Sequence, residues 1–167
     1  MIKKILLKSI TIKLAFFFAL IIFILDQFSK YLIKSYIGPY DIIKVTPFLN
    51  IVYVENIGSA FGMFKDLGNV FFIAVTSIAI IFISYLIIKD RDNRTGLSLI
   101  LGGAAGNLMD RLLHGYVIDF LDVYIGKHHW PAFNIADAAL TIGFIFMIIN
   151  LFSHKKIIHN KAKQTHY

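Results

Sequence analysis

The sequence predicts an α-helical integral membrane protein with four transmembrane helices and a small extracytoplasmic β-rich element between the first two. Of its 167 residues, 57% are hydrophobic, and the mean hydropathy is +0.71, whereas soluble domains average about 45–50% apolar residues. Four apolar runs approach the length of about 20 residues that a bilayer-spanning helix needs. The basic residues gather at the ends of these runs. Together these features predict a single membrane domain.

The four runs cover residues 10–29, 67–88, 95–113 and 135–153. We expect each to be a helix, because a chain in lipid must satisfy its backbone hydrogen bonds internally. The second run is uncharged, and the others carry charge only near their ends. A cleaved signal peptide is the alternative for the first run, which follows three lysines, but no small-x-small cleavage site follows Leu25.

The positions of the basic residues indicate the orientation of the runs, since cytoplasmic loops are enriched in Lys and Arg. Most of the 17 basic residues lie before or at the start of the first run, in the short connection between the second and third, or after the fourth: Lys3, Lys4, Lys8, Lys13, Lys89, Arg91, Arg94, Lys155, Lys156, Lys161 and Lys163. We therefore predict that both termini are cytoplasmic, including the basic tail 154–167. Every acidic residue except Asp90 and Asp92 then lies at or beyond the outer surface.

The two longer connections, residues 30–66 and 114–134, are predicted to be extracytoplasmic loops. In the first, "DIIKV" and "LNIVYVEN" are rich in β-branched and aromatic residues and flank Pro47, which predicts two short strands joined by a turn. A two-stranded hairpin is marginal alone, so we expect it to rest on the membrane surface and the helices. The following "ENIGSAFGMF" is either a surface linker or an element that dips into the lipid headgroups.

Composition and motifs exclude several kinds of site. The net charge of +7 could suggest nucleic acid, but the basic residues form no aromatic-interleaved patch. The chain has no cysteine and neither G-x-S-x-G nor H-E-x-x-H, while His128 and His129 are adjacent and project apart. Thiol, serine and zinc catalysis are therefore disfavoured. The remaining candidates are the outer aspartates: Asp26, Asp110, Asp119, Asp122 and Asp137.

Polar residues recur at helical spacing near the end of the third run. Asn107 precedes Asp110 by three residues and Arg111 by four, so their side chains are neighbours on a helix. Spacing alone leaves Arg111 open either to a structural ion pair or to a contact with a substrate carbonyl. Gly102 and Gly106 form a GxxxG earlier in the run, which favours close helix packing.

The sequence "FNIAD" at the beginning of the fourth run has two interpretations. Asn134 is a good N-cap, and Asp137 falls in the first turn, where the helix dipole stabilises an anion. The motif is either a structural cap or a means of keeping one carboxylate ionised. A carboxylate held charged beside one held neutral is what a hydrolase with paired aspartates needs.

Five short motifs resemble, in order and spacing, the conserved blocks of the lipoprotein signal peptidase (signal peptidase II) family. They are "DQFSK" (26–30), "NIGSAF" (56–61), "GNLMDR" (106–111), "VIDF" (117–120) and "FNIAD" (133–137). Each motif alone is weak, whereas five in order on four apolar runs are highly specific. The blocks span most of the chain. Ser59 stands where the family more often has Ala, and the basic tail matches nothing in particular.

The resemblance implies an intramembrane aspartic endopeptidase of the bacterial cytoplasmic membrane. Such an enzyme removes signal peptides from prolipoproteins, cutting before a diacylglyceryl-modified cysteine. The resemblance implies that Asp119 and Asp137 are the catalytic pair, of which we predict Asp137 to be the starting base. It implies substrate-binding or supporting roles at eight further positions: Asp26, Asn56, Gly58, Phe61, Asn107, Asp110, Arg111 and Asn134. Asp122 is then a solvated or structural neighbour.

The resemblance also predicts what the protein binds. The partners are lipid-modified prolipoprotein, membrane lipids and cyclic peptide inhibitors such as globomycin, with no nucleic acid, metal or cofactor. We expect a monomer whose active site lies near the extracytoplasmic face.

Two other functional classes are alternatives. A small transporter or proton-coupled channel could use the same acids, but these collect at one face and do not line a path across the bilayer. An assembly protein held by GxxxG packing would leave the outer acids unexplained. A cleavage assay separates the three classes, because only the peptidase shortens a prolipoprotein.

Overall fold

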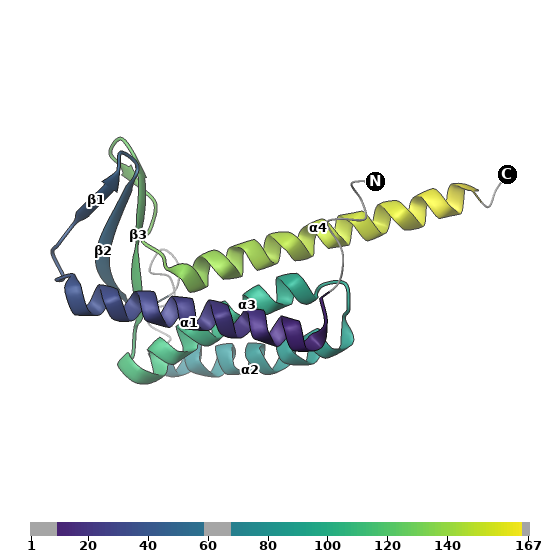
Figure 1. The fold of residues 1–167 in the computed structure, drawn as a ribbon, viewed down its shortest axis with the longest axis horizontal. Coiled ribbons are helices and arrows are strands. Elements are labelled where there is room, and N and C mark those ends of the chain that lie inside the picture. Colours follow the sequence, from purple (N-terminus) through teal and green to yellow (C-terminus); the bar gives the residue numbers. More distant parts are fainter. Residues whose placement is uncertain (1–9, 59–67, 165–167) are drawn as a thin grey trace.

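The computed structural model describes residues 10–58 and 68–164, with side-chain environments up to residue 153. Its elements, in chain order, are α1 (Ile12–Tyr36), β1 (Ile43–Thr46), β2 (Leu49–Asn56), α2 (Gly68–Lys89), α3 (Arg94–His114), β3 (Val117–Ile125), β4 (His128–His129) and α4 (Ile135–Gln164). The strands stand at one end of the helical bundle, whereas the α2–α3 turn and the beginning of α1 lie at the other (Figure 1). We call the end of the bundle that carries the strands the sheet end.

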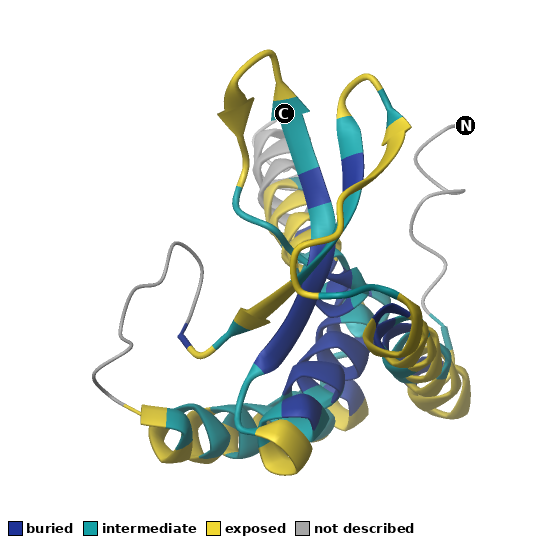
Figure 2. Ribbon diagram, turned by 90° about the vertical axis from the view of Figure 1, so that its left-hand side faces the viewer, coloured by how far each residue is buried: buried dark blue, intermediate teal, exposed yellow. Residues whose placement is uncertain are grey.

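Helix α3 is the central helix and packs against α1, α2 and α4. Glycines make this packing possible, because a methyl group at Gly102 would lie 2.6 Å from the Ala19 carbonyl oxygen and one at Gly103 2.5 Å from that of Ala136. Small residues at such contacts let helix backbones approach closely, as the GxxxG pattern indicated. Buried residues gather along this central helix and in the part of the sheet that adjoins the helices (Figure 2).

Three helical segments in the described chain are long and apolar enough to cross a membrane: Ile12–Tyr36, Gly68–Lys89 and Ile135–Ser153. Large apolar side chains are exposed along all three, as lipid-facing surfaces require; Phe17, Ile78 and Phe144 are examples. Helix α3 is not among these three segments. It lies between the other helices, so it does not need the apolar outer face of a lipid-exposed helix and can contain small and polar residues. That α3 also crosses the membrane, as the predicted four spans require, stays a prediction.

The sheet is antiparallel with strand order β1-β2-β3-β4. Its β1–β2 hairpin confirms the two strands predicted around Pro47. Strand β3, which contains "VIDFLDV", was not predicted. The four consecutive residues 117–120 are all buried, so the segment lacks the alternation of apolar and polar residues that marks a half-buried strand.

Some boundaries differ from the predicted ones. Helix α1 continues to Tyr36, so the outer loop does not begin at residue 30, because Lys30 and Ile33 are buried against the rest of the fold. Helix α4 continues to Gln164, so the predicted tail begins as helix. The two alternatives for "ENIGSAFGMF", a surface linker or an element that dips into the headgroups, concern residues mostly outside the described part, Phe61 among them.

Candidate active site

Asp119 lies in β3, where the β2–β3 ladder places it opposite Val54, and is only 2% exposed. Its Oδ2 accepts a hydrogen bond from Nδ2 of Asn56 at 2.9 Å, and its Oδ1 accepts one from Nδ2 of Asn134 at 2.7 Å. Both carboxyl oxygens therefore face an amide donor, which fixes the orientation of the carboxyl group.

The pKa of Asp119 is raised from its ordinary value of 3.8 to about 7, mainly by burial and then by the nearby charge of Asp137. The amides of Asn56 and Asn134 and the cation of Lys30 oppose this shift in the pKa, because they stabilise the carboxylate. With a pKa of about 7, the group is present in both its acid and its carboxylate form at neutral pH.

Asp137 lies in the first turn of α4, where Asn134 forms the cap. The Asp137 backbone N–H donates to Oδ1 of Asn134 at 2.9 Å, and the Asn134 backbone N–H donates to Oδ2 of Asp137 at 3.3 Å. This reciprocal pair resembles a capping box. The other oxygen, Oδ1, accepts from Nδ2 of Asn107 at 2.8 Å. The capping interpretation is thus correct, and it leaves Asp137 beside the polar residues of α3.

Two asparagines connect the two aspartates. Asn134 donates through Nδ2 to Asp119 and also to Oδ1 of Asn107 at 3.2 Å, and Asn107 donates in turn to Asp137. Asn134 is fully buried and Asn107 is 8% exposed. The bridge brings a residue of β3, one of α3 and one of α4 to a single site.

A second pair of carboxylates supports the first. The Ala136 backbone N–H donates to Oδ1 of Asp26 at 2.9 Å, and the Ile118 backbone N–H donates to Oδ2 of Asp110 at 3.0 Å. Ala136 and Ile118 are the residues immediately before Asp137 and Asp119. Asp26 and Asp110 thus fix the backbone just ahead of each candidate catalytic residue, which is a positioning role.

Lys30 lies between these supporting carboxylates and is 2% exposed. Its Nζ lies 2.8 Å from Oδ2 of Asp26 and 2.9 Å from Oδ2 of Asp110, and it donates to Oδ1 of Asn107 at 3.0 Å. Gln27 also donates to both carboxylates. Lys30 and Gln27 were not among the predicted site residues. The available signal was a lysine four residues after Asp26, on the same helix face.

Arg111 connects α3 to the loop after β2. Its Nη2 donates to the Gly58 carbonyl oxygen at 3.1 Å, and its guanidinium carbon lies 5.0 Å from the centre of the Phe72 ring. The Gly58 N–H donates to Oδ1 of Asn56 at 3.0 Å. Arg111 therefore holds the backbone next to Asn56, the residue that donates a hydrogen bond to Asp119. Within the described residues, Arg111 donates to carbonyl oxygens and forms no close ion pair.

Asp122 belongs to a different cluster, further along the sheet. It accepts from Nδ2 of Asn50 at 2.8 Å and lies 2.8 Å from Nδ1 of His129. The His129 ring stacks on Tyr124, with centroids 5.0 Å apart. Asp122 is therefore a buried structural residue that joins β2, β3 and β4, and not a solvated one.

We expect Asp122→Asn to lower stability with little effect on catalysis. Weakening a charge-assisted hydrogen bond costs about 2 kcal/mol, so the melting temperature in detergent should fall. Turnover of a lipidated precursor, measured below the melting temperature, should stay within about threefold of wild type. Among the residues that the structure describes, no hydrogen bond or ion pair joins Asp122 to Asp119 or Asp137. A loss as complete as that of Asp119→Asn would contradict this assignment.

The predicted site residues thus meet in one network, except Phe61, which is outside the described residues. Among the residues that the structure describes, no group of three or more His, Cys, Asp or Glu side chains could hold a metal ion. The network joins the carboxyl groups of Asp119 and Asp137 through the amides of Asn134 and Asn107. The fold and the site together define a membrane protein with a candidate paired-aspartate hydrolytic centre.

Comparison with known proteins gives the family. Residues 18–153 match the signal peptidase (SPase) II family. The chain is 49% identical to the lipoprotein signal peptidase of Thermodesulfovibrio yellowstonii over 77% of this chain and 87% of the relative. It is 43% identical to that of Alteromonas mediterranea, over 84% and 82% of the two chains. A solved bacterial membrane enzyme, 38% identical, matches with a TM-score of 0.81 over 89% of this chain and 93% of its own.

The chain belongs to the signal peptidase II family, and it is a membrane-integral protease.

Proposed function

We propose that Asp119 and Asp137 form the catalytic pair of this enzyme, which removes signal peptides from prolipoproteins. The observation that carries the proposal is the bridge from Asp119 through Asn134 and Asn107 to Asp137. It keeps two carboxyl groups close enough for the charge of one to raise the pKa of the other.

Two carboxyl groups that share one proton can hydrolyse a peptide bond without a metal. Asp137, held at a helix N-terminus that stabilises an anion, takes a proton from water. Asp119, in its acid form, donates a proton to the scissile carbonyl oxygen. The roles reverse when the tetrahedral intermediate collapses, so the amine leaves with a proton and the pair returns to its starting state.

The surrounding residues supply orientation. Asn56 and Asn134 hold Asp119, and Asn107 holds Asp137. Arg111 and Gly58 keep Asn56 in place. These contacts support positioning roles for the three asparagines, Arg111 and Gly58. Asp26 and Asp110 position the pair in another way, by accepting hydrogen bonds from the backbone N–H groups of Ala136 and Ile118.

The proposed substrate is a prolipoprotein with a diacylglyceryl-modified cysteine, and the cut falls before that residue. The lipid stays in the bilayer while the peptide lies across the sheet end. Exposed apolar side chains on α1, α2 and α4 support contact with both lipid and substrate tail. Cyclic peptides such as globomycin should compete for this site, and the enzyme should act as a monomer.

The proposed topology has four spans, with α3 as the third and both termini cytoplasmic. Two observations support it. The described beginning of α1 and the basic α2–α3 turn lie at one end of the bundle, and β3 and the beginning of α4, which carry Asp119 and Asp137, lie at the sheet end (Figure 1). Basic residues favour the cytoplasmic side. The candidate site is then near the extracytoplasmic face.

Cleavage of a lipidated precursor by the purified protein tests the proposed function. Wild-type protein should shorten the precursor, globomycin should block the reaction, and a precursor lacking the diacylglyceryl group should be a poor substrate. A transporter or an assembly protein would leave the precursor intact.

The pH dependence of cleavage should follow the acid form of Asp119. Because the pKa of Asp119 is raised to about 7, kcat/KM should fall as the pH rises beyond about 7, by tenfold per pH unit at the limit. Asn56→Ala removes a donor that stabilises the carboxylate, so it should move this descending limb to higher pH. The limb reports an apparent pKa of the pair. A flat profile from pH 6 to pH 9 would contradict the proposed acid.

The raised pKa also has a consequence for folding. Since the pKa in the folded chain exceeds the ordinary value of 3.8, the contribution of Asp119 to stability is fully present below 3.8. It is lost as the pH rises through about 7.

A further inference from the structure

The beginning of α2 contacts Arg111 at two points. Asn69 donates through Nδ2 to the Arg111 carbonyl oxygen at 3.0 Å, and the Arg111 guanidinium carbon lies over the Phe72 ring, 5.0 Å from its centre. Asn69 and Phe72 stand three residues apart in one helix, so their side chains lie on the same face. Helix α2 therefore contacts both the backbone and the side chain of Arg111.

The hydrogen bonds of the guanidinium leave a part for the ring to play. Nη2 donates to the Gly58 carbonyl oxygen at 3.1 Å, whereas the bond from Nη1 to the Asn107 carbonyl oxygen is long, at 3.5 Å. One short bond and one long bond allow the guanidinium to tilt about the line between them. The Phe72 ring lies against the guanidinium and limits that tilt.

The environment of this contact strengthens it. Phe72 and Arg111 are both half-buried, and Phe72 belongs to a segment able to cross a membrane. A cation is attracted to the face of an aromatic ring, and the attraction grows when water is excluded. An aliphatic side chain at this position would fill space without attracting the charge.

Contacts continue from Arg111 to Asp119. The Gly58 N–H donates to Oδ1 of Asn56 at 3.0 Å, and Nδ2 of Asn56 donates to Oδ2 of Asp119 at 2.9 Å. A displaced guanidinium therefore releases Gly58, and with it the amide that orients the Asp119 carboxyl group.

We propose that Phe72 is a positioning residue for peptide cleavage. Its ring fixes the guanidinium of Arg111, and Arg111 in turn fixes Gly58 and Asn56 beside Asp119. This role rests on the proposed function of Asp119, whereas the contact between Phe72 and Arg111 can be tested separately from cleavage.

Cleavage of a lipidated precursor by Phe72→Leu tests the role. Leucine is apolar but has no ring, so kcat/KM should fall about tenfold, as expected for a partly desolvated contact between a cation and a ring. The Asn56 donor to the Asp119 carboxylate loosens, so the descending limb of the pH profile should move to higher pH. Phe72→Tyr keeps a ring and should stay within about twofold of wild type. Phe82→Leu is the matched control, because Phe82 lies further along α2 and is 59% exposed; it should cleave like wild type.

A double-variant cycle shows whether Phe72 acts through Arg111. The side chain of Arg111→Gln carries no cation, so adding Phe72→Leu to it should lower kcat/KM by less than about twofold. An equal loss in both backgrounds would mean that the ring only supports packing, which contradicts the proposal.

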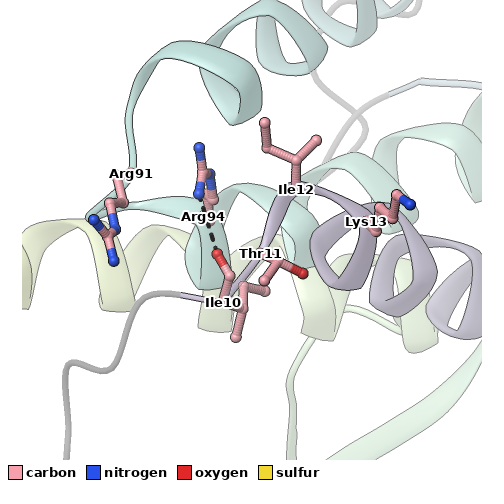
Figure 3. Close-up of a pocket in the computed structure, with 6 residues that line it drawn as sticks. All are labelled: Ile10, Thr11, Ile12, Lys13, Arg91 and Arg94. Atoms are coloured by element: carbon pink, nitrogen blue, oxygen red, sulfur yellow. Dashed lines mark hydrogen bonds between the residues drawn. The ribbon is translucent and has the colours of Figure 1, made fainter.

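The side-chain signals of arginine give a readout that does not depend on cleavage. The chain has three arginines. Two of them, Arg91 and Arg94, line a pocket at the end of the bundle opposite the sheet, where Arg94 donates to the Ile10 carbonyl oxygen at 3.3 Å (Figure 3). In nuclear magnetic resonance spectra of protein with isotope-labelled arginine, Phe72→Leu should shift the guanidinium signals of Arg111, because the ring current is lost. The signals of Arg91 and Arg94 should stay in place.

Unchanged Arg111 signals in Phe72→Leu would overturn the proposal, and so would a wild-type rate with an unmoved pH limb. Equal losses in Phe72→Tyr and Phe72→Leu would show that the ring is not what matters. Thermal melting checks each fold, and Phe72→Met is a second variant without a ring for which the same result is expected. A wild-type protein that leaves the precursor intact would contradict the proposed function, and the Arg111 signals would still show whether Phe72 holds the guanidinium.

Discussion

Asp119→Asn and Asp137→Asn should each reduce cleavage of a lipidated prolipoprotein by about 10²–10⁴-fold, the range for loss of a general acid or base. Asparagine keeps the size of the side chain and one acceptor oxygen, so the contacts with Asn56, Asn107 and Asn134 survive in part. What it removes is the proton that the pair exchanges. The measurement is the initial rate of precursor shortening in detergent at neutral pH.

Two controls make this result specific. The melting temperature of each variant is measured and turnover is compared below it, because asparagine replaces one acceptor oxygen of a buried carboxyl group by a donor. Asp122→Asn removes a carboxylate from the same strand and should keep turnover. Near-normal turnover of Asp119→Asn or Asp137→Asn would remove that residue from the mechanism.

Lys30→Met should have the second large effect. The change leaves Asp26 and Asp110 buried without their shared cation, and breaking a buried ion pair costs about 3–5 kcal/mol. Asn107 also loses the donor that orients its amide toward Asp137. Cleavage should fall roughly a hundredfold, the cost of a displacement of about 1 Å at reacting groups. Thermal melting and turnover below the melting point measure the two effects.

Lys34→Met is the matched control, because Lys34 lies one helical turn further along α1, is exposed, and contacts His114 and Tyr116 at its surface. It should change neither quantity substantially. Adding Asp110→Asn to Lys30→Met removes one uncompensated charge, so it should recover part of the lost stability. Equal melting temperatures for Lys30→Met and wild type would show that the buried cation does not support the fold.

Much of the fold could be predicted because local patterns determine it. Apolar length identified α1, α2 and α4, and the β-branched segments around Pro47 identified the β1–β2 hairpin. The cap at Asn134 followed from residue type and spacing. The choice of Asp119 and Asp137 as the pair came from the resemblance, because spacing alone leaves several outer aspartates equivalent.

The rest depended on tertiary contacts that a sequence does not display. The first four residues of β3, 117–120, are all buried. The strand therefore lacks the alternation of apolar and polar residues, with a period of two, by which a half-buried strand is recognised. Lys30 is a lysine in a region predicted as a loop, and only the approach of α1 to α3 makes it the partner of Asp110. Asp122 was expected to be solvated or structural, and its burial follows from the meeting of Asn50 and His129 across the sheet.

The rate of the double variant Asp119→Asn/Asp137→Asn, compared with both single variants under single-turnover conditions, tests the central claim most directly. If the two carboxyl groups act as one unit, removing the second costs little once the first is gone. We predict that the double variant and each single variant share the same residual rate within a few-fold. Losses that multiply, or a single variant that cleaves at the wild-type rate, would contradict a catalytic pair.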